Sequence, residues 1–212
     1  MIIQSCLSDF SRKEIVRKMN HKSLFFKYVI PSIIAFALSG IYAIVDGYFV
    51  GNTIGDAGLS AINIVYPIEA LIQALGTGIG MGGAVYYSIN AAEKKGKRAE
   101  EFIATSWWLL VIVSVISTII IYSFSSKILG LLGADGIILT NATDYIKIIA
   151  LGAILQILGT GMMPFIRNYG NSFWSMFAMV GGFITNIVLD FIFVWIYEMG
   201  MKGAATATIA GQ

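Results

Sequence analysis

Three acidic residues fall inside long apolar stretches of the sequence, where a charge is expensive. They are Asp46, Glu69 and Asp190. If such a stretch crosses a bilayer, an Asp at its centre costs about 2.5–3.5 kcal/mol, so acids of this kind usually face a bundle interior or a water-filled cavity and mark functional sites. Neither Asp46 nor Asp190 has a Lys or Arg nearby in sequence. A buried ion pair is therefore not the obvious explanation, and the structural alternative is an acid that hydrogen-bonds to hold helices together.

A polar pair near position 190 favours the functional interpretation. Asn186 and Asp190 are four residues apart, so both side chains project from one face of a helix. A carboxylate beside an amide oxygen supplies hard oxygen ligands for Na⁺, or a hydrogen-bonded cage for a proton. Burial disfavours the charged form of a carboxyl group, which would let such a group load and unload a proton near physiological pH. Together with Asp46, the pair predicts a coupling site for H⁺ or Na⁺.

The third acid, Glu69, has Gln73 one helical turn further along the chain. Two interpretations fit it equally well. The two side chains line the mouth of a cavity, or the long Glu69 side chain reaches out to the membrane interface.

Other chemistries find little support. The single cysteine, Cys6, and the single histidine, His21, cannot form a metal site or a nucleophile–base pair. A G-x-G-x-x-G pattern at 78–83 has no preceding strand and no acid about 20 residues on, so it fails as a dinucleotide-binding fingerprint. We expect no enzyme activity, no bound cofactor, and no metal apart from Na⁺ at Asp46, Asn186 and Asp190.

The composition indicates the elements that hold these residues. Hydrophobic side chains make up 57% of the chain and charged ones 12%, against about 25% charged in soluble domains. A membrane helix needs about 20 mostly apolar residues, and five stretches qualify: 28–50, 62–90, 102–126, 148–166 and 173–197. A sixth begins at Gly203 and is too short to cross the bilayer. We expect an all-α integral membrane bundle of five complete helices and the start of a sixth, in a chain that stops before its lobe is complete.

The basic residues predict the orientation. Eleven of the 14 lie before the first stretch, after the second or after the fourth, and only three lie on the other side. By the positive-inside rule the N-terminus and the loop 91–101 are cytoplasmic. We expect a multi-pass protein of the cell membrane whose partner is the lipid bilayer. A net charge of +2 is too small to suggest a nucleic-acid partner.

The chain divides into a basic cytoplasmic tail, 1–24, and a transmembrane lobe, 25–212. Two alternatives to a solvated tail remain for the first 20 residues. They form an interfacial amphipathic helix, or they are an upstream extension of a reading frame that begins at Met19.

Small residues and prolines indicate how the helices pack. The pairs Gly76/Gly80 and Gly78/Gly82 have the small-xxx-small spacing that permits close helix contact. Pro31, about four turns from Asp46, and Pro164 are candidate kinks.

Several motifs, taken in order and spacing, resemble the N-terminal lobe of the multidrug and toxic compound extrusion (MATE) family. The resemblance covers about 27–212. It is carried by Pro31, the glycine-rich second stretch, IVDGYFVG at 44–51, PFIRNYGN at 164–171, NIVLD at 186–190 and GMKGAATAT at 200–208.

The resemblance implies a two-lobe, twelve-helix antiporter that exports organic, cationic substrates in exchange for H⁺ or Na⁺ by alternating access. It also implies a second lobe beyond this chain. The residues matching the family's coupling site are Asp46, Asn186, Asp190 and Thr208, and Pro31 matches the position where the first helix bends. Glu69 departs from the family pattern.

Export has several rival functions. A lipid-linked precursor flippase of the same superfamily, and an inactive fragment or half-transporter subunit, remain the alternatives. An intramembrane aspartyl protease fits poorly, because neither Val45-Asp46-Gly47 nor Leu189-Asp190-Phe191 resembles the motifs of those enzymes.

Overall fold

The structure is a computed structural model that describes residues 21–169 and 172–212, with the side chains of ten residues between 21 and 36 and of Ser172 excepted. The described residues form six α-helices and one π-helix, and no strand. Their bounds are α2 (His21–Thr53), α3 (Asp56–Ala92), α4 (Gly96–Leu131), α5 (Gly136–Asn168), α6 (Ser172–Asp190), η1 (Phe191–Ile196) and α7 (Gly200–Ala210). The all-helical membrane fold is confirmed. Most of the predicted tail, and both alternatives for it, lie outside the described residues.

Four of the five predicted stretches lie within longer observed helices, and the fifth, 173–197, runs one residue past the end of η1. Within the described part of the chain, four segments are long and apolar enough to cross a membrane: α3, α4, α5 and Phe173–Ile196. In hydrocarbon every backbone amide and carbonyl needs an internal partner, which a helix provides. Hydropathy marks only the part of a helix that matches the hydrocarbon, so it missed the helix ends. One of the three basic residues on the predicted outer side, Lys147, lies inside α5, and the sixth helix begins at Gly200 rather than Gly203.

The fifth predicted stretch changes its helix type at Asp190. From Phe191 the backbone widens into the π-helix η1, where the amide of Tyr197 donates to the carbonyl of Ile192 at 2.9 Å. The amide of Met199 donates to the carbonyl of Phe193 at the same distance. Short π segments inside α-helices often occur at functional sites, and this one directly follows a buried acid.

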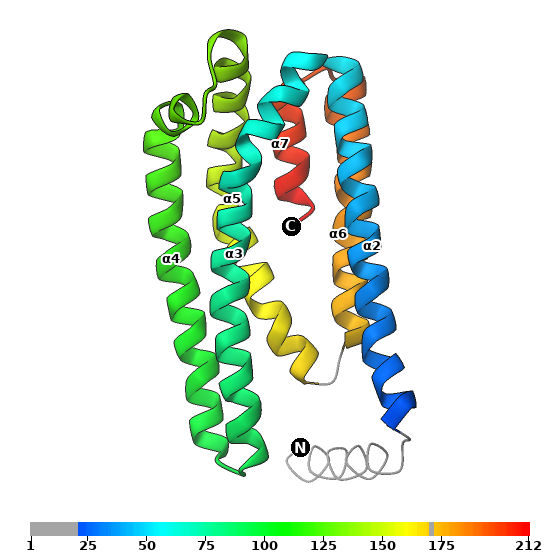
Figure 1. Cartoon of the computed structure of the whole chain (residues 1–212), viewed down its shortest axis with the longest axis vertical. Coiled ribbons are helices and arrows are strands. Elements are labelled where there is room, and N and C mark those ends of the chain that lie inside the picture. Colours follow the sequence, from blue (N-terminus) through cyan, green and yellow to red (C-terminus); the bar gives the residue numbers. More distant parts are fainter. Residues whose placement is uncertain (1–20, 170–171) are drawn as a thin grey trace.

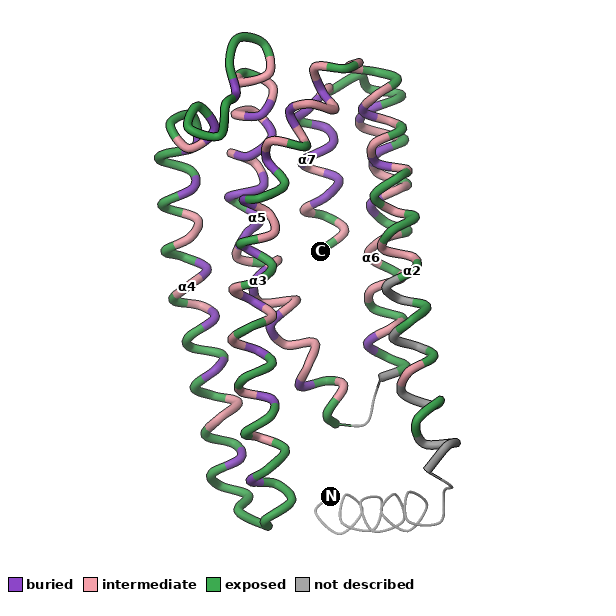
Figure 2. The backbone as a smooth tube through the Cα atoms, viewed as in Figure 1, coloured by how far each residue is buried: buried purple, intermediate pink, exposed green. Residues whose placement is uncertain are grey.

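The helices pack as two groups that α7 connects (Figure 1). On one side α3, α4 and α5 pack against one another, and on the other α2 lies along α6. The short α7 contacts both α5 and α6. Buried residues are frequent on α7 and on α5, whereas α2 and α4 expose much of their length (Figure 2).

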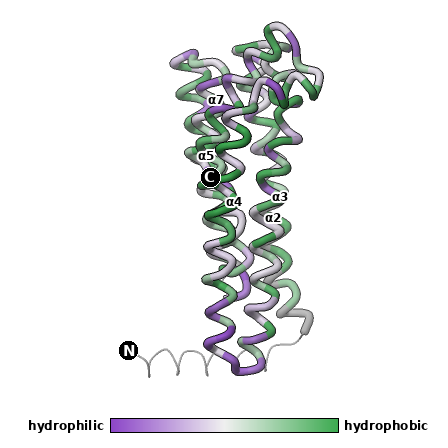
Figure 3. The backbone as a smooth tube through the Cα atoms, turned by 90° about the vertical axis from the view of Figure 1, so that its left-hand side faces the viewer, coloured by the Kyte–Doolittle hydropathy of each residue, from purple (hydrophilic) through white to green (hydrophobic). Residues whose placement is uncertain are grey.

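The exposed surface at mid-length is apolar, and the polar residues gather toward the ends of the helices (Figure 3). Large side chains such as Trp108 and Ile119 are 65% and 60% exposed. A soluble protein rarely exposes so much contiguous apolar surface, so this surface fits contact with lipid.

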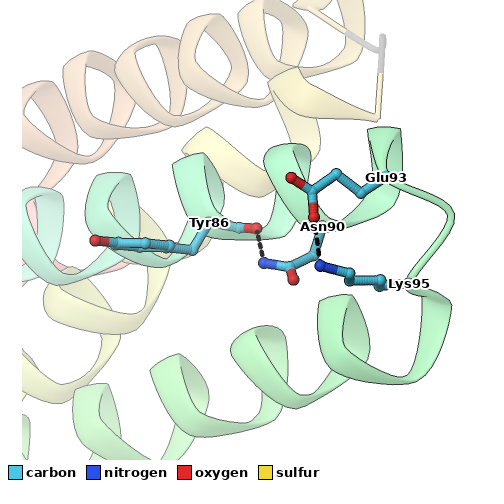
Figure 4. Close-up of polar contacts among 4 residues, drawn as sticks. All are labelled: Tyr86, Asn90, Glu93 and Lys95. Carbon is cyan, nitrogen blue, oxygen red and sulfur yellow. Dashed lines mark hydrogen bonds and ion pairs between the residues drawn. The ribbon is translucent and has the colours of Figure 1, made fainter.

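The turn between α3 and α4 carries the basic loop of the chain (Figure 4). The Nδ2 of Asn90 donates to the carbonyl of Tyr86 at 2.8 Å and closes the last turn of α3. Beyond it, Lys95 Nζ pairs with Glu93 Oε2 at 2.7 Å. A hydrogen bond from Lys95, and its charge, lower the pKa of Glu93. The start of α2 and the junction of α5 with α6 lie at the same end of the bundle as this loop (Figure 1), so the fold brings the predicted cytoplasmic segments together.

Of the predicted glycine pairs, one makes a helix contact and the other does not. A side chain at Gly80 would run into the backbone of Gly161, and one at Gly76 would lie 2.9 Å from the carbonyl oxygen of Ile157. Both glycines therefore let α3 approach α5 closely. A Cβ atom added at Gly78 or Gly82 would have nothing within 4 Å, and both positions face outward.

The structure describes the side chain of one candidate kink, Pro164, but not that of the other, Pro31. Pro164 lies inside α5, which bends in its second half toward the start of α6 (Figure 1). A proline removes the hydrogen bond to the carbonyl four residues earlier, which accounts for a bend here. α2 runs through position 31, but the side chain of Pro31 lies outside the described part of the structure.

The glycine contact gives a matched test of the packing. We expect Gly80→Ala to lower the stability of the folded protein by about 1–3 kcal/mol, the usual cost of overpacking, because its methyl group meets the α5 backbone. Gly78→Ala is the control, since it faces open space and alanine is the better helix former. Thermal unfolding of the purified protein in detergent measures both. Equal melting temperatures for the two variants would contradict this packing.

Candidate functional site

Aromatic contacts hold α2 against α6 and η1 on both sides of Asp46. One turn before it, the rings of Tyr42 and Phe183 stack at 5.3 Å. One turn after it, Phe49 contacts Phe191 and Trp195 at 6.3 and 6.2 Å. These contacts fix the register of α2 on α6.

That register places Asp46 next to Asp190. The two carboxyl groups are close enough to interact directly. Asp46 is 8% exposed and Asp190 is fully buried. Two acids that are 144 residues apart in sequence therefore form one buried pair.

The short helix α7 completes this side of the bundle. A side chain at Gly182 of α6 would collide with the carbonyl of Gly211, and one at Gly152 of α5 would collide with Ile209. The two glycines thus let α7 fit tightly between α5 and α6. Thr208 of α7 is buried, and its hydroxyl donates to the carbonyl of Ala204 at 3.0 Å. It lies beside the hydroxyl groups of Tyr42 and Tyr145.

Asn186 shares the buried face of α6 with Asp190. It is 3% exposed, and the end of α7 packs on it, since a side-chain carbon at Gly211 would lie 2.8 Å from Asn186 Cβ. Neither Nδ2 nor Oδ1 of Asn186 has a hydrogen-bond partner in the described part of the protein.

The acid pair has no positive partner among the described residues. Among the described residues the ion pairs are Lys95–Glu93 and Lys202–Asp144, at 2.7 and 3.5 Å, and both are largely exposed. Within the same part of the chain, Asp46 Oδ1 and both carboxyl oxygens of Asp190 are buried without a hydrogen bond. Buried polar atoms nearly always have a hydrogen-bond partner. The unpaired oxygens of Asp46 and Asp190 are therefore candidates for binding a cation or a proton.

Glu69 approaches the same region from α3. Its side chain is half-buried, its Oε1 is buried, and it lies beside Tyr145 of α5. This placement differs from that of a side chain that extends to the membrane interface. Gln73, one turn on, is exposed.

Two tyrosines of this region were not singled out from the sequence. Tyr42 lies one turn from Asp46, and Tyr145 is 2% exposed between Glu69 and Thr208. In an apolar stretch a tyrosine looks like a packing residue. The only sequence signal is the i, i+4 spacing of Tyr42 and Asp46 on α2.

The donor set suits a small monovalent cation. Protein sites for divalent metals such as Ca²⁺ use six to eight oxygen ligands. In the described residues no three side chains of Asp, Glu, His or Cys lie close enough to hold a metal ion. The unpaired oxygens of Asp46, Asn186 and Asp190 could instead take up a proton, or supply part of the oxygen shell of Na⁺.

Comparisons with known proteins show what the whole chain is similar to. The chain is 32% identical over 203 residues to the multidrug export protein MepA of Staphylococcus saprophyticus, covering 94% of this chain and 43% of that protein. It is 29% identical over 199 residues to MepA of Staphylococcus aureus strain NCTC 8325, with the same coverage. The chain thus spans less than half the length of these curated relatives.

The fold is similar to that of a multidrug resistance MATE family transporter of the MOP superfamily solved in an outward-facing conformation. That likeness has a TM-score of 0.82 and 28% sequence identity, and it covers 87% of this chain and 41% of the other. The MatE family model matches residues 31–192, which include Asp46, Glu69, Asn186 and Asp190. This chain therefore belongs to the MATE family of membrane transporters.

Proposed function

We propose that this chain forms one lobe of a multidrug efflux antiporter, which exports organic, cationic substrates in exchange for H⁺ or Na⁺ by alternating access. The observation that carries the proposal is the buried Asp46–Asp190 pair, of which Asp46 Oδ1 and both oxygens of Asp190 lack a hydrogen bond, and which has no positive partner in the described residues. In membranes, acids placed in this way belong to proton relays and ion pathways.

The relatives support export rather than an enzymatic reaction. Relatives that match 94% of the chain are called multidrug export proteins, and they are more than twice as long. We propose that a second lobe completes the substrate pathway, as the resemblance implied, and that the substrate occupies the space between the lobes.

The site would couple export to an ion gradient through charge. With its carboxyl groups ionised, the pair holds negative charge in a membrane interior, and binding H⁺ or Na⁺ removes that cost. One charge crossing 100 mV yields about 2.3 kcal/mol. At about 1.4 kcal/mol per tenfold ratio this sustains a gradient of about 40-fold when the exported substrate is neutral. One-for-one exchange against a singly charged cation moves no net charge and removes this voltage contribution.

Charge-neutralising substitutions at the pair test the proposal. We expect Asp46→Asn and Asp190→Asn each to reduce ion-driven efflux of ethidium at least tenfold, because an amide cannot take up the cation. The measurement is efflux from cells that express the full-length protein, with a proton or sodium gradient imposed. Both variants should fold, since they replace a buried carboxyl by a neutral group of the same shape, and their melting temperatures serve as the check.

The control is Asp56→Asn, which removes an exposed acid from the first turn of α3 and should leave efflux unchanged. Normal ion-driven efflux in both pair variants would overturn the coupling role. Accumulation of a lipid-linked precursor in cells lacking the protein, without any ethidium efflux by the wild type, would favour the flippase instead.

We further propose that the protein lies in the cell membrane with the turn between α3 and α4 in the cytoplasm. The support is the cluster of Lys94, Lys95, Lys97 and Arg98 at this turn, together with the location of the start of α2 and of Arg167 at the same end of the bundle.

Cysteine labelling tests this orientation. In a Cys6→Ser background without other accessible cysteines, we expect Lys94→Cys to react with a membrane-impermeant maleimide only after the cells are broken. Asp135→Cys, on the exposed turn between α4 and α5, should react in intact cells. The reverse pattern would show that the topology is inverted.

A further inference from the structure

Glu69 lies near the Asp46–Asp190 pair but is not part of it. It comes from α3 and lies beside Tyr145 of α5, whereas the pair is formed by α2 and α6. No three acids in the described residues are close enough to share one metal ion. Glu69 is therefore not a further ligand of an ion held by the pair, and whatever binds to it needs a position of its own.

The surroundings of Glu69 are negative or neutral. The groups that act on it are Tyr145 and the charge of Asp46, and no lysine or arginine is among them. On the elements around it, Tyr42 and Asp190 are the further titratable groups of this region. The charged residues of α4, the other helix packed on α3, lie in its first two turns and at Lys127 near its far end. Lys147 is two residues from Tyr145 and so projects from another side of α5.

The buried carboxyl oxygens of this region lack hydrogen-bond partners in the described residues, which favours the binding of a positive charge. Glu69 Oε1 is buried without a hydrogen bond in the described part of the chain, as are both oxygens of the fully buried Asp190. Carboxyl groups from three helices thus face one region of the membrane interior. One cation at the pair would leave Glu69 uncompensated whenever it is ionised.

Hydroxyl groups connect the two positions. Tyr145 lies beside both Glu69 and Thr208, and Thr208 also lies beside Tyr42, one turn from Asp46. A hydroxyl both donates and accepts hydrogen bonds, so these side chains can adjust to either charge state of the carboxyl groups at each end. These side chains place polar groups on α3, α5, α7 and α2 in one region of the bundle.

We propose that Glu69 binds a second proton of the transport cycle, separate from the cation carried by Asp46 and Asp190. A proton fits better than a metal ion because it needs a single carboxyl oxygen, whereas a metal ion needs several ligands. In this step the Glu69 carboxylate takes up one proton from water and becomes a neutral carboxyl, and it returns that proton to water on the other side. The inference rests on the proposed antiport function and adds one charge to its stoichiometry.

The first test detects the proton itself. We expect the infrared difference spectrum between acidic and alkaline buffer, recorded on the full-length protein in detergent, to contain carbonyl stretches of protonated carboxyl groups. Glu69→Gln should remove one of these bands and leave the band of the pair, whereas Asp190→Asn should change the latter. Asp56→Asn on the same helix is the matched control and should remove neither. A wild-type spectrum in Glu69→Gln would overturn the inference.

The second test counts charges. In proteoliposomes that contain the full-length protein, the number of protons exchanged per ethidium molecule should fall by one in Glu69→Gln, as measured from the pH gradient that balances a known ethidium gradient. An unchanged number would overturn the inference.

A conservative variant keeps the inference testable if Glu69→Gln does not fold. If Glu69→Gln does not yield folded protein, Glu69→Asp keeps a carboxyl group at the same position, and its carbonyl band should move relative to the wild type. An identical spectrum for the Asp variant would overturn the inference. The proposed function fails separately, if Asp46→Asn and Asp190→Asn retain ion-driven efflux.

Discussion

Buried negative charge without a positive partner is the constraint on which this lobe depends. A carboxylate in the interior of a membrane bundle is costly unless a cation or a proton neutralises it. The described structure places Asp46 and Asp190 together and provides neither a basic side chain nor a hydrogen bond for their buried oxygens. A carboxylate pair buried in this way is stabilised when a positive charge or a proton reaches it.

The helix packing makes this arrangement specific. Aromatic contacts on either side of Asp46 hold α2 in one register on α6 and η1. The close approach of α7 at Gly152 and Gly182 brings Thr208 between the two groups of helices. With α3 fixed on α5 through Gly76 and Gly80, Glu69 and Tyr145 face the same region. Contacts between small residues thus determine where the polar side chains meet.

Much of this could be predicted from the sequence, for physical reasons that also explain the gaps. The depth of Asp46 and Asp190 in apolar stretches, and the spacing of Asn186, pointed to one buried site because charge in hydrocarbon is so costly. The sequence could not tell Gly76 and Gly80 from Gly78 and Gly82, since the face of a helix that meets a neighbour is decided by tertiary packing. The π-helix after Asp190 was missed because a change of hydrogen-bond register leaves no mark in the composition.

For a similar reason the sequence could not decide whether the Glu69 side chain points inward or toward the membrane interface. The inward direction adds a third carboxyl group to this region. A long acidic side chain in the first part of an apolar stretch can reach water or turn inward, and only the position of α5 decides between them. Because it turns inward, the carboxyl groups of α2, α3 and α6 gather around Tyr145 and Thr208. A cation shifts a conformational equilibrium only by as much as it prefers one state over the other. The groups of this region come from both groups of helices and from α7, so a relative movement of those helices would change the distances between the charges.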